Sequence, residues 1–318
     1  MSSISLGMVF PGQGAQSVGM MDGLAEEFPQ VHKRFESASR VLGFDLWQLV
    51  HTGPAETLNQ TQHTQPALLA ASVATWDIWR ALGGGLPRLM AGHSFGEYSA
   101  LVCAGALDFE DAVALVAARG RHMQEAVAPG AGAMAAVLGL EAEVLQGVCK
   151  EASAAGIVEC ANLNAPGQVV LSGTSAGVAR ASELAKAAGA KKVIPLAVSV
   201  PAHCALMEPA AARYATRIAE VRFTAPEIPV LHNVDVDTHS EPEGIRQALV
   251  AQLSRSVRWQ ETMAEFARRG ITHIVECGPG KVLGPLVKRG APGVEPLALA
   301  SPAEIRSALA HLTGSLEA

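Results

Sequence analysis

The sequence predicts an α/β protein in which most of the chain folds around a parallel β-sheet. Strand-like apolar runs alternate with helix-like runs along almost the whole chain, without an internal repeat. The chain has 318 residues, of which 49% are hydrophobic, so it can bury a large core in one large domain or two smaller ones. Residues 128–200 depart from the alternation and predict a second unit of different topology.

The expected elements of the larger unit, residues 1–127 and 201–318, follow from apolar runs and helix-ending residues. A helix is predicted at 66–82, because Pro66 suits a first helical turn and three glycines then end the pattern. The apolar run at 87–93 is too short for a helix and predicts a buried strand, followed by a helix from Glu97. The other expected elements are a short apolar strand before residue 10, a helix at 109–126, a strand at 229–234, helices reaching 250 and 266, a strand at 271–277 and a helix after 280.

Residues 128–200 predict a small unit with the order strand, helix, strand, strand, helix, strand. The strands are expected at 133–139, 157–163, 168–172 and 192–198, and the helices at 141–155 and 175–188. This βαββαβ order is typical of a ferredoxin-like fold, and it lies between "PGAG" at 129–132 and Pro201. We therefore expect an α/β-hydrolase-like large domain with an inserted ferredoxin-like small domain, and the functional site in the cleft between them.

Composition and charge argue against several classes of partner. The net charge is −6 and 17% of the residues are charged, so the chain has no broad basic field for nucleic acid or an anionic membrane surface. The N-terminal residues lack a basic segment before an apolar run, and no stretch approaches about 18 uninterrupted apolar residues, which predicts a soluble cytoplasmic protein. The five cysteines form no C-x-x-C pair, so we expect neither a disulfide framework nor a zinc ribbon.

The stretch "GHSFG", residues 92–96, places a serine between two glycines where a strand is expected to lead into a helix. This pattern is typical of the nucleophile elbow of α/β-hydrolase-like enzymes, because Gly92 and Gly96 avoid clashes at the strained corner and leave the Ser94 hydroxyl exposed. The amide of Phe95 would lie at a helix N-terminus, where an unpaired N–H stabilises an oxyanion. A small turn without reactivity is the alternative that these five residues leave open.

A serine nucleophile needs a general base, and His203 in "VSVPAHCALM" is the candidate. It follows Pro201 at the boundary between the two units, where a loop can face Ser94 across the cleft. Because no Asp or Glu stands out as the third member of a triad, a backbone carbonyl could orient the imidazole instead. A histidine with a structural role is the alternative, since the chain has ten histidines.

Two further polar residues occur in motifs that allow a role in the site. The glycine-rich "FPGQGAQS", residues 10–17, lacks the third glycine of a dinucleotide fingerprint, but Gln13 could supply a second oxyanion donor. Arg119 follows a mainly apolar run on a predicted helix, and a guanidinium in the cleft would bind a carboxylate through two hydrogen bonds. Taken alone, "FPGQGAQS" is more simply interpreted as an ordinary turn, and Arg119 as a solvated cation near a helix end.

Two other motifs are interpreted as structural. "ECGPGKVL", residues 276–283, does not match a phosphate-binding loop, because position 275 is valine and not the required first glycine, and Val282 replaces the Ser or Thr. It therefore predicts a strand-to-helix turn. "HNVDVDTH", residues 232–239, contains two histidines and two aspartates. Its histidines differ in parity along a strand and no further ligand motif follows, so we expect a strand end leading into a loop and no metal site.

Seven stretches together resemble the malonyl-CoA:acyl carrier protein transacylases of bacterial fatty-acid synthesis, in the same order over nearly the whole chain. They are "FPGQGAQS", "TQPALLAASVATW", "GHSFGEYSALVCAGAL", "RGRHMQEAV", "ANLNAPGQVVLSG", "VSVPAHCALM" and "ECGPGKVL". Related acyltransferase domains of polyketide synthases share the elbow and the first glutamine loop. The resemblance implies transfer of malonyl from CoA to the phosphopantetheine thiol of acyl carrier protein, through a malonyl-serine intermediate and without a metal or bound redox cofactor.

The resemblance also implies roles for six residues of the quoted stretches and of "LVAQLSRSVRW". They are Ser94 as the acylated nucleophile, His203 as its general base, Arg119 as the binder of the malonyl carboxylate, Gln252 as a polar residue near the histidine, and Gln13 and Phe95 as amide donors of the oxyanion hole. The chain departs from many relatives at two expected pocket positions, with Ala202 in place of serine and Phe95 in place of leucine. An arginine makes physical sense, because a buried malonyl carboxylate without a cationic partner would cost several kcal/mol.

Two rival functions share part of this pattern. A serine esterase or thioesterase has the same elbow, but it needs no arginine in the acyl pocket and usually has an acidic triad member. A catalytically inactive module that only docks carrier proteins is the second rival. For docking an acidic carrier protein we single out the basic pairs Lys191–Lys192 and Lys288–Arg289, whose simpler interpretation is a solvated surface.

Overall fold

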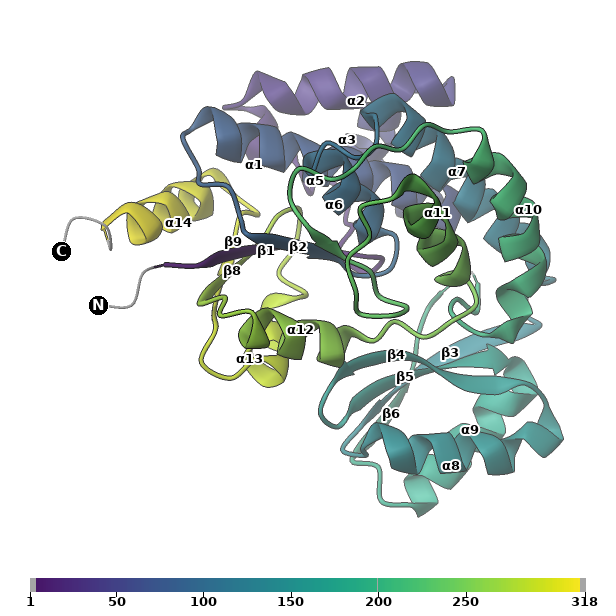
Figure 1. Cartoon of the computed structure of the whole chain (residues 1–318). Helices are drawn as coiled ribbons and strands as arrows, with labels where there is room; N and C mark the ends of the chain where they lie inside the picture. Colours follow the sequence, from purple (N-terminus) through teal and green to yellow (C-terminus); the bar gives the residue numbers. More distant parts are fainter. Residues whose placement is uncertain (1–3, 199, 315–318) are drawn as a thin grey trace.

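Five short parallel strands form the central sheet of the larger unit (Figure 1). The structure is a computed structural model and describes residues 4–198 and 200–314. The sheet order is β7-β2-β1-β8-β9, and every neighbouring pair is parallel, as the alternating pattern predicts. The strands are β1 (Leu6–Phe10), β2 (Leu89–Gly92), β7 (Val230–Leu231), β8 (His273–Glu276) and β9 (Glu295–Ala298).

Helices cover both faces of this sheet (Figure 1). They are α1 (Asp22–Ala25), α2 (Pro29–Leu42), α3 (Leu46–Thr52), α4 (Ala55–Leu58), α5 (Thr61–Ala81), α6 (Gly96–Cys103), α7 (Phe109–Ala126), α10 (Glu208–Ala219), α11 (Pro242–Ala251), α12 (Trp259–Arg268), α13 (Gly284–Gly290) and α14 (Pro302–Gly314). Strand β1 is buried on both sides: Met8 and Phe10 belong to the core that contains α5 and α6, and Val9 packs with residues of α12 and α13. Burial on both faces explains the continuous apolar sequence of this strand.

A separate antiparallel sheet is formed by residues 132–195, with the order β4-β5-β3-β6. Its elements are β3 (Gly132–Leu138), α8 (Ala142–Ala152), β4 (Val158–Ala165), β5 (Gln168–Thr174), α9 (Ser175–Ala187) and β6 (Lys192–Pro195). They follow one another in the predicted βαββαβ order. Along β3 the side chains alternate: Ala135 and Val137 pack under α8 and α9, while Met134 and Ala136 line a cavity on the opposite face.

Several predicted boundaries differ from the observed ones; for example, the strand predicted at 192–198 ends at Pro195. Helix α5 begins at Thr61, so Pro66 lies inside the helix and not in its first turn. The extra turn packs against α7 at Gly120, where a Cβ atom would come within 2.5 Å of the Gln62 Cα atom. This close helix packing stabilises a turn that the local proline signal did not predict. The strand expected at 229–234 is shorter, because pairing with β2 covers only Val230–Leu231.

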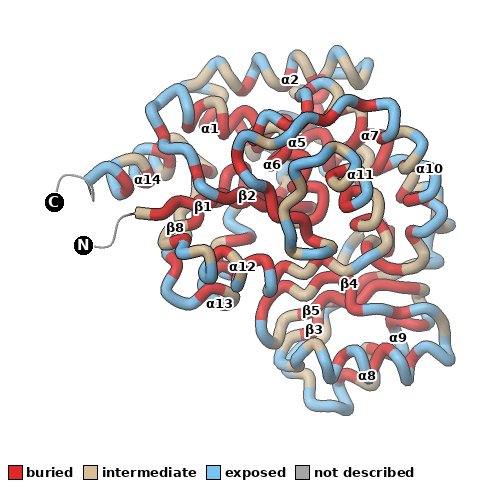
Figure 2. The backbone as a smooth tube through the Cα atoms, viewed as in Figure 1, coloured by how far each residue is buried: buried red, intermediate tan, exposed pale blue. Residues whose placement is uncertain are grey.

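The interior of the molecule is continuous around β1 and β2, and the exposed residues lie mainly on the outer faces of the helices (Figure 2). The two sheets are linked by packing of β4 against α12 and α13. Among the residues that the structure describes, no helix is both long and apolar enough to span a bilayer.

Candidate active site

The nucleophile elbow forms as the sequence predicts, with Ser94 between the end of β2 and the start of α6. Ser94 has a φ of 54°, in the left-handed region that non-glycine residues rarely adopt. A Cβ atom at Gly92 would overlap the backbone of Gly96, and one at Gly96 would lie 2.5 Å from the Phe10 carbonyl oxygen. The two glycines are therefore required by the close approach of strand, turn and helix.

His203 lies directly against Ser94, although 109 residues separate them in the chain. Its Nε2 atom is 2.7 Å from the Ser94 Oγ atom, and its Nδ1 atom is 2.7 Å from the backbone oxygen of Gln252. The carbonyl can only accept, so Nδ1 carries the proton and Nε2 offers its lone pair to the Ser94 hydroxyl. A backbone carbonyl thus orients the imidazole, the expected alternative to an acidic triad member.

Burial sets the protonation state of this histidine. His203 is 3% exposed, and loss of solvent lowers its pKa to about 3, with the nearby positive charge of Arg119 as the second cause. The imidazole therefore remains neutral at physiological pH. A neutral imidazole bonded to a serine hydroxyl can accept the proton of that hydroxyl as a general base.

Arg119 projects from α7 into the same site and is 1% exposed. Its Nη1 atom donates to the Gln65 side-chain oxygen at 3.0 Å, and its Nη2 atom donates to the Gln252 side-chain oxygen at 2.9 Å and to the Ser94 Oγ atom at 3.5 Å. Within residues 4–198 and 200–314, no carboxylate forms an ion pair with Arg119, and its Nε has no hydrogen-bond partner. A buried guanidinium without an anion is costly, so the site is suited to an anionic ligand.

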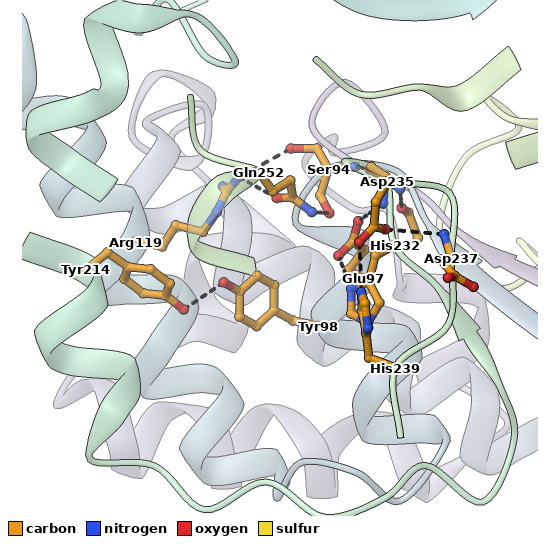
Figure 3. Close-up of polar contacts among 12 residues, drawn as sticks. Ser94, Glu97, Tyr98, Arg119, Tyr214, His232, Asp235, Asp237, His239 and Gln252 are labelled. Carbon is orange, nitrogen blue, oxygen red and sulfur yellow. Dashed lines mark hydrogen bonds and ion pairs between the residues drawn. The ribbon is translucent and has the colours of Figure 1, made fainter. Parts of the chain in front are cut away.

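Gln252 is hydrogen-bonded to Ser94, His203 and Arg119, and Figure 3 shows part of this network. It is fully buried at the end of α11. Its side-chain oxygen accepts from Arg119, its side-chain nitrogen donates to the Ser94 carbonyl at 3.0 Å, and its own carbonyl accepts from His203. One residue therefore fixes the positions of the predicted base, the predicted nucleophile and the cation.

The two predicted oxyanion donors lie at the same cavity. The N–H of Ser94 is occupied, because it donates to the Asn233 side-chain oxygen at 2.7 Å. The backbone N–H groups of Gln13 and Phe95 have no hydrogen-bond partner in the described part of the chain. The Gln13 side chain accepts from Thr61 Oγ1 at 3.2 Å, which leaves the backbone amide as its contribution to the cavity. This arrangement is consistent with the predicted roles of both amides.

The cavity has a volume of about 290 Å³ and is lined by strands of the antiparallel sheet, by the loops that follow β1 and β2, and by residues before and within α13. Ser94, His203 and Arg119 form its polar end, and side chains such as Met134 and Leu286 form apolar walls. The site therefore lies between the parallel and the antiparallel sheet, where the sequence predicted a cleft.

The loop "ECGPGKVL" is the predicted strand-to-helix connection, between β8 and α13. The buried Glu276 carboxylate accepts hydrogen bonds from the backbone N–H groups of Val282, Leu283 and Gly284 at 2.9 to 3.0 Å. The pKa of Glu276 is raised above its ordinary value, because the effect of burial exceeds the opposing effect of these hydrogen bonds. Glu276 thus shapes the loop whose residues Val282 and Leu283 line the cavity.

The only described cluster of side chains with metal-ligand spacing lies away from the cavity, at His273, Glu295 and His311. His273 and Glu295 are the first residues of β8 and β9. They therefore lie at the N-terminal ends of the parallel strands, whereas the elbow follows the C-terminal end of β2. In the "HNVDVDTH" segment, His239 pairs with Asp235 at 2.8 Å near the surface. None of these residues is placed to take part in chemistry at Ser94.

Sequence reasoning missed several polar residues that line the site or support the elbow. Gln65 lies within the quoted "TQPALLAASVATW" and Glu97 within the quoted elbow stretch, but neither was singled out. His232 and Asn233 were considered only as part of a possible metal motif. A buried polar residue inside an apolar helical run, such as Gln65, is the signal that could have found one of them.

Comparisons with known proteins agree with this geometry. The model of the acyl transferase domain family matches residues 8–302. The malonyl CoA-acyl carrier protein transacylase of Salmonella typhimurium is 51% identical over 301 residues, covering 95% of this chain and 97% of the relative. The corresponding protein of Bacillus subtilis is 44% identical over 308 residues, covering 96% of this chain and 97% of the relative.

Solved structures extend the similarity to three dimensions. The malonyl CoA-acyl carrier protein transacylase of Coxiella burnetii superposes with a TM-score of 0.96 at 50% identity, covering 98% of each chain. A malonyl-transacylase solved in complex with an acyl carrier protein superposes with a TM-score of 0.95 at 51% identity, covering 96% of this chain and 99% of that one. The chain therefore belongs to the acyl transferase domain family and, within it, to the malonyl-CoA:acyl carrier protein transacylases.

Proposed function

We propose that this protein transfers the malonyl group of malonyl-CoA to the phosphopantetheine thiol of acyl carrier protein, through a malonyl ester of Ser94. The observation that carries the proposal is the buried Arg119, whose Nη2 atom is 3.5 Å from the Ser94 hydroxyl and whose charge has no carboxylate partner in the described residues. A malonyl group supplies the missing carboxylate when its thioester carbonyl lies at Ser94. The transacylase activity named for the relatives supports the same conclusion.

The first half-reaction follows from the hydrogen bonds of the site. His203 Nε2 takes the proton of the Ser94 hydroxyl while Oγ attacks the thioester carbonyl. The amides of Gln13 and Phe95 stabilise the oxyanion. When the tetrahedral intermediate collapses, the carbon–sulfur bond breaks and the CoA thiol leaves with the proton from His203.

The second half-reaction reverses these steps with a different thiol. The phosphopantetheine thiol gives its proton to His203 and attacks the malonyl ester, and Ser94 recovers its proton on release. Gln65 and Gln252 hold the Arg119 guanidinium so that one N–H on each terminal nitrogen can bind the malonyl carboxylate throughout. The glutamines thus make Arg119 a fixed reference point for the acyl group in both steps.

Intact-mass spectrometry after mixing with malonyl-CoA tests the proposed function. We expect one malonyl adduct per chain that is stable in buffer and disappears when acyl carrier protein bearing a phosphopantetheine thiol is added. An adduct lost equally fast in buffer alone would indicate the esterase or thioesterase function. Failure to form any adduct would indicate a module that only docks carrier proteins.

We further infer a cytoplasmic enzyme that uses no resident metal or redox cofactor. All five cysteines are free thiols, and the sulfur atoms of Cys149 and Cys160 lie 3.9 Å apart without a bond, which is typical of a reducing compartment. Each proposed proton transfer and bond change is assigned to the chain and its two substrates.

We also infer that residues 128–200 form an inserted domain that closes the cavity over the acyl group, since Met134 and Ala136 of this segment lie in the wall of the cavity.

Replacing His203 with alanine should leave a folded protein whose acylation rate falls by roughly 10²- to 10⁴-fold, because the general base is removed. The rate is measured in a single turnover with malonyl-CoA. His122, a partly buried histidine outside the cavity lining, provides a matched control as His122→Ala. A near-normal rate for His203→Ala would assign the base to another residue.

The acylation rate of the wild-type protein should also be nearly independent of pH between about pH 5 and 7. The pKa of His203 is lowered to about 3, so its neutral form persists well below the usual histidine range and is lost only as the pH approaches 3. A histidine with an ordinary pKa would lose about 20-fold in rate over the same interval. Single-turnover rates at malonyl-CoA concentrations well below KM, which report the protonation of the free enzyme, distinguish these two profiles.

The basic residues proposed for carrier docking are exposed, but they differ in their contacts. Lys191, Lys192 and Lys288 are exposed, whereas Arg289 donates to the Gln168 side-chain oxygen at 2.6 Å and thereby links α13 to β5. Arg289 is therefore unsuitable for a clean charge reversal. The three lysines remain the candidates for contacts with an acidic carrier protein.

Reversing the charge of Lys191 and Lys192, or of Lys288, should raise the KM for acyl carrier protein by about 2- to 5-fold at low salt and by less at high salt. Acylation by malonyl-CoA alone should not change. Lys33→Glu on α2, on the side of the molecule opposite to the antiparallel sheet, is the matched control (Figure 1). An unchanged KM at low salt would exclude these lysines from the docking surface.

A further inference from the structure

A buried side-chain amide holds both ends of the elbow. The Asn233 side-chain oxygen accepts the N–H of Ser94 at 2.7 Å, and its side-chain nitrogen donates to the carbonyl of Gly92 at 2.8 Å. Asn233 is fully buried and follows β7, the strand that pairs with β2. It is 139 residues from Ser94 in the chain, so these contacts depend on the tertiary fold.

A second buried layer holds Asn233. The Glu97 carboxylate, on the first turn of α6, accepts the backbone N–H of Asn233 at 2.5 Å and a hydrogen bond from His232 Nδ1 at 2.9 Å. Glu97 and His232 have no exposed surface. Figure 3 shows Glu97 and His232 side by side near Ser94, on the side away from Arg119. The elbow thus has a polar support that is separate from the residues proposed to bind substrate.

We propose that Asn233 is a positioning residue that fixes the Ser94 hydroxyl against His203, and that Glu97 fixes Asn233 in turn. The proposal deepens the proposed function, because it rests on Ser94 being the nucleophile. It concerns the orientation of Ser94 and no contact with the malonyl group.

The conformation of Ser94 explains why such a support is needed. A serine with a φ of 54° is strained, and the two backbone groups that flank this turn are the Gly92 carbonyl and the Ser94 amide. One side-chain amide satisfies both groups, in place of the peptide that would do so in a longer sheet. Without it, the turn would lose two buried hydrogen bonds and could relax toward a less strained conformation. The serine oxygen would then leave its position 2.7 Å from His203.

Asn233 also determines which amides face the oxyanion. Because its oxygen occupies the N–H of Ser94, that group cannot serve as a donor to the substrate. The N–H groups of Phe95 and Gln13 are left for this role. The asparagine therefore separates the amide that stabilises the turn from the amides that stabilise the reaction.

The first experiment compares Asn233→Ala with His239→Ala. His239 is a suitable control, because its ring lies 5.2 Å from the His232 ring while its hydrogen bond goes to Asp235 near the surface. We expect Asn233→Ala to lower the acylation rate at saturating malonyl-CoA by roughly 10²-fold, the effect of a displacement of about 1 Å. The KM for malonyl-CoA should stay within about 3-fold, because Arg119 is untouched. His239→Ala should keep the wild-type rate.

A second variant tests the hydrogen bonds directly. Asn233→Asp keeps the shape of the side chain, and its protonated carboxyl can both accept from Ser94 and donate to Gly92. Burial and the negative charge of Glu97, whose carboxylate binds the backbone N–H of residue 233 and His232 Nδ1, should raise the pKa of this new carboxyl. The acylation rate of Asn233→Asp should therefore rise toward that of wild type as the pH falls from about 8 to 5. A residue with only a structural role would not produce this recovery.

Sulfonylation of Ser94 by phenylmethanesulfonyl fluoride separates this proposal from the proposed function. This reagent needs the serine and its base but has no carboxylate for Arg119, so its rate should fall in Asn233→Ala and recover at low pH in Asn233→Asp. If wild type is sulfonylated but not malonylated, the proposed function fails and the positioning role is still measured. A wild-type sulfonylation rate in folded Asn233→Ala overturns the positioning role. If Asn233→Ala does not fold, a pH-independent rate in Asn233→Asp overturns it.

Discussion

Replacing Ser94 with alanine should abolish the malonyl adduct, with a loss of roughly 10⁶-fold in acylation rate, as when other serine enzymes lose their nucleophile. The physical reason is the elbow. Among the described residues, Ser94 is the serine that combines a strained left-handed backbone with a hydrogen bond to a neutral histidine. The measurement is the adduct stoichiometry by intact-mass spectrometry after mixing with malonyl-CoA.

The matched control is Ser99→Ala, which removes a buried hydroxyl from the same helix α6 outside the cavity lining. It should retain one adduct per chain. Labelling of Ser94→Ala at the wild-type stoichiometry would mean that another side chain carries the acyl group.

Replacing Arg119 with alanine should reverse the preference of the enzyme between acyl donors. The malonyl carboxylate would be buried without a cation, which corresponds to a loss of roughly 2 to 5 kcal/mol in malonyl transition-state binding. Acetyl-CoA lacks the carboxylate and should react as well as before or better. The measurement is kcat/KM for both donors, with circular dichroism to confirm folding.

Two further variants make this result specific. Arg119→Lys should recover only part of the malonyl activity, because an ammonium cannot form two parallel hydrogen bonds to a carboxylate and cannot contact both Gln65 and Gln252 with the same geometry. Arg121→Ala removes an exposed arginine from the same helix and should change neither donor. Equal losses for malonyl and acetyl donors in Arg119→Ala would show that this residue supports the structure and does not bind the carboxylate.

Features with a local cause could be predicted from the sequence. The βαββαβ order followed from runs of apolar residues and glycine or proline boundaries, and α7 follows the predicted bounds because Asp108 caps its start. The elbow followed from two glycines at positions where a Cβ atom would collide with neighbouring backbone. The resemblance then implied Arg119 as the carboxylate binder and Gln252 as a polar residue near the histidine, and the structure shows the two side chains hydrogen-bonded.

Features that depend on long-range packing could not be predicted. The Asn233 contact with Ser94 joins the ends of two parallel strands, and no local pattern marks it. Pro66 predicted a helix start, but packing against α7 extends α5 by five residues from Pro66 back to Thr61. In the same way, the role of Glu97 appears only when the turn after β7 places a backbone N–H against its carboxylate.

Arg119 lies beside His203 and has no carboxylate partner among the described residues. Binding of a substrate carboxylate to Arg119 is therefore linked to the basicity of His203. The guanidinium charge of Arg119 lowers the pKa of His203 and so helps to keep the imidazole unprotonated. When a carboxylate neutralises that guanidinium, this repulsion weakens and the imidazole becomes a stronger base. An acyl group without a carboxylate leaves the histidine in its weaker form. Under the proposed mechanism, donor selection acts on the chemical step as well as on binding, because an acyl group with a carboxylate increases the basicity of His203.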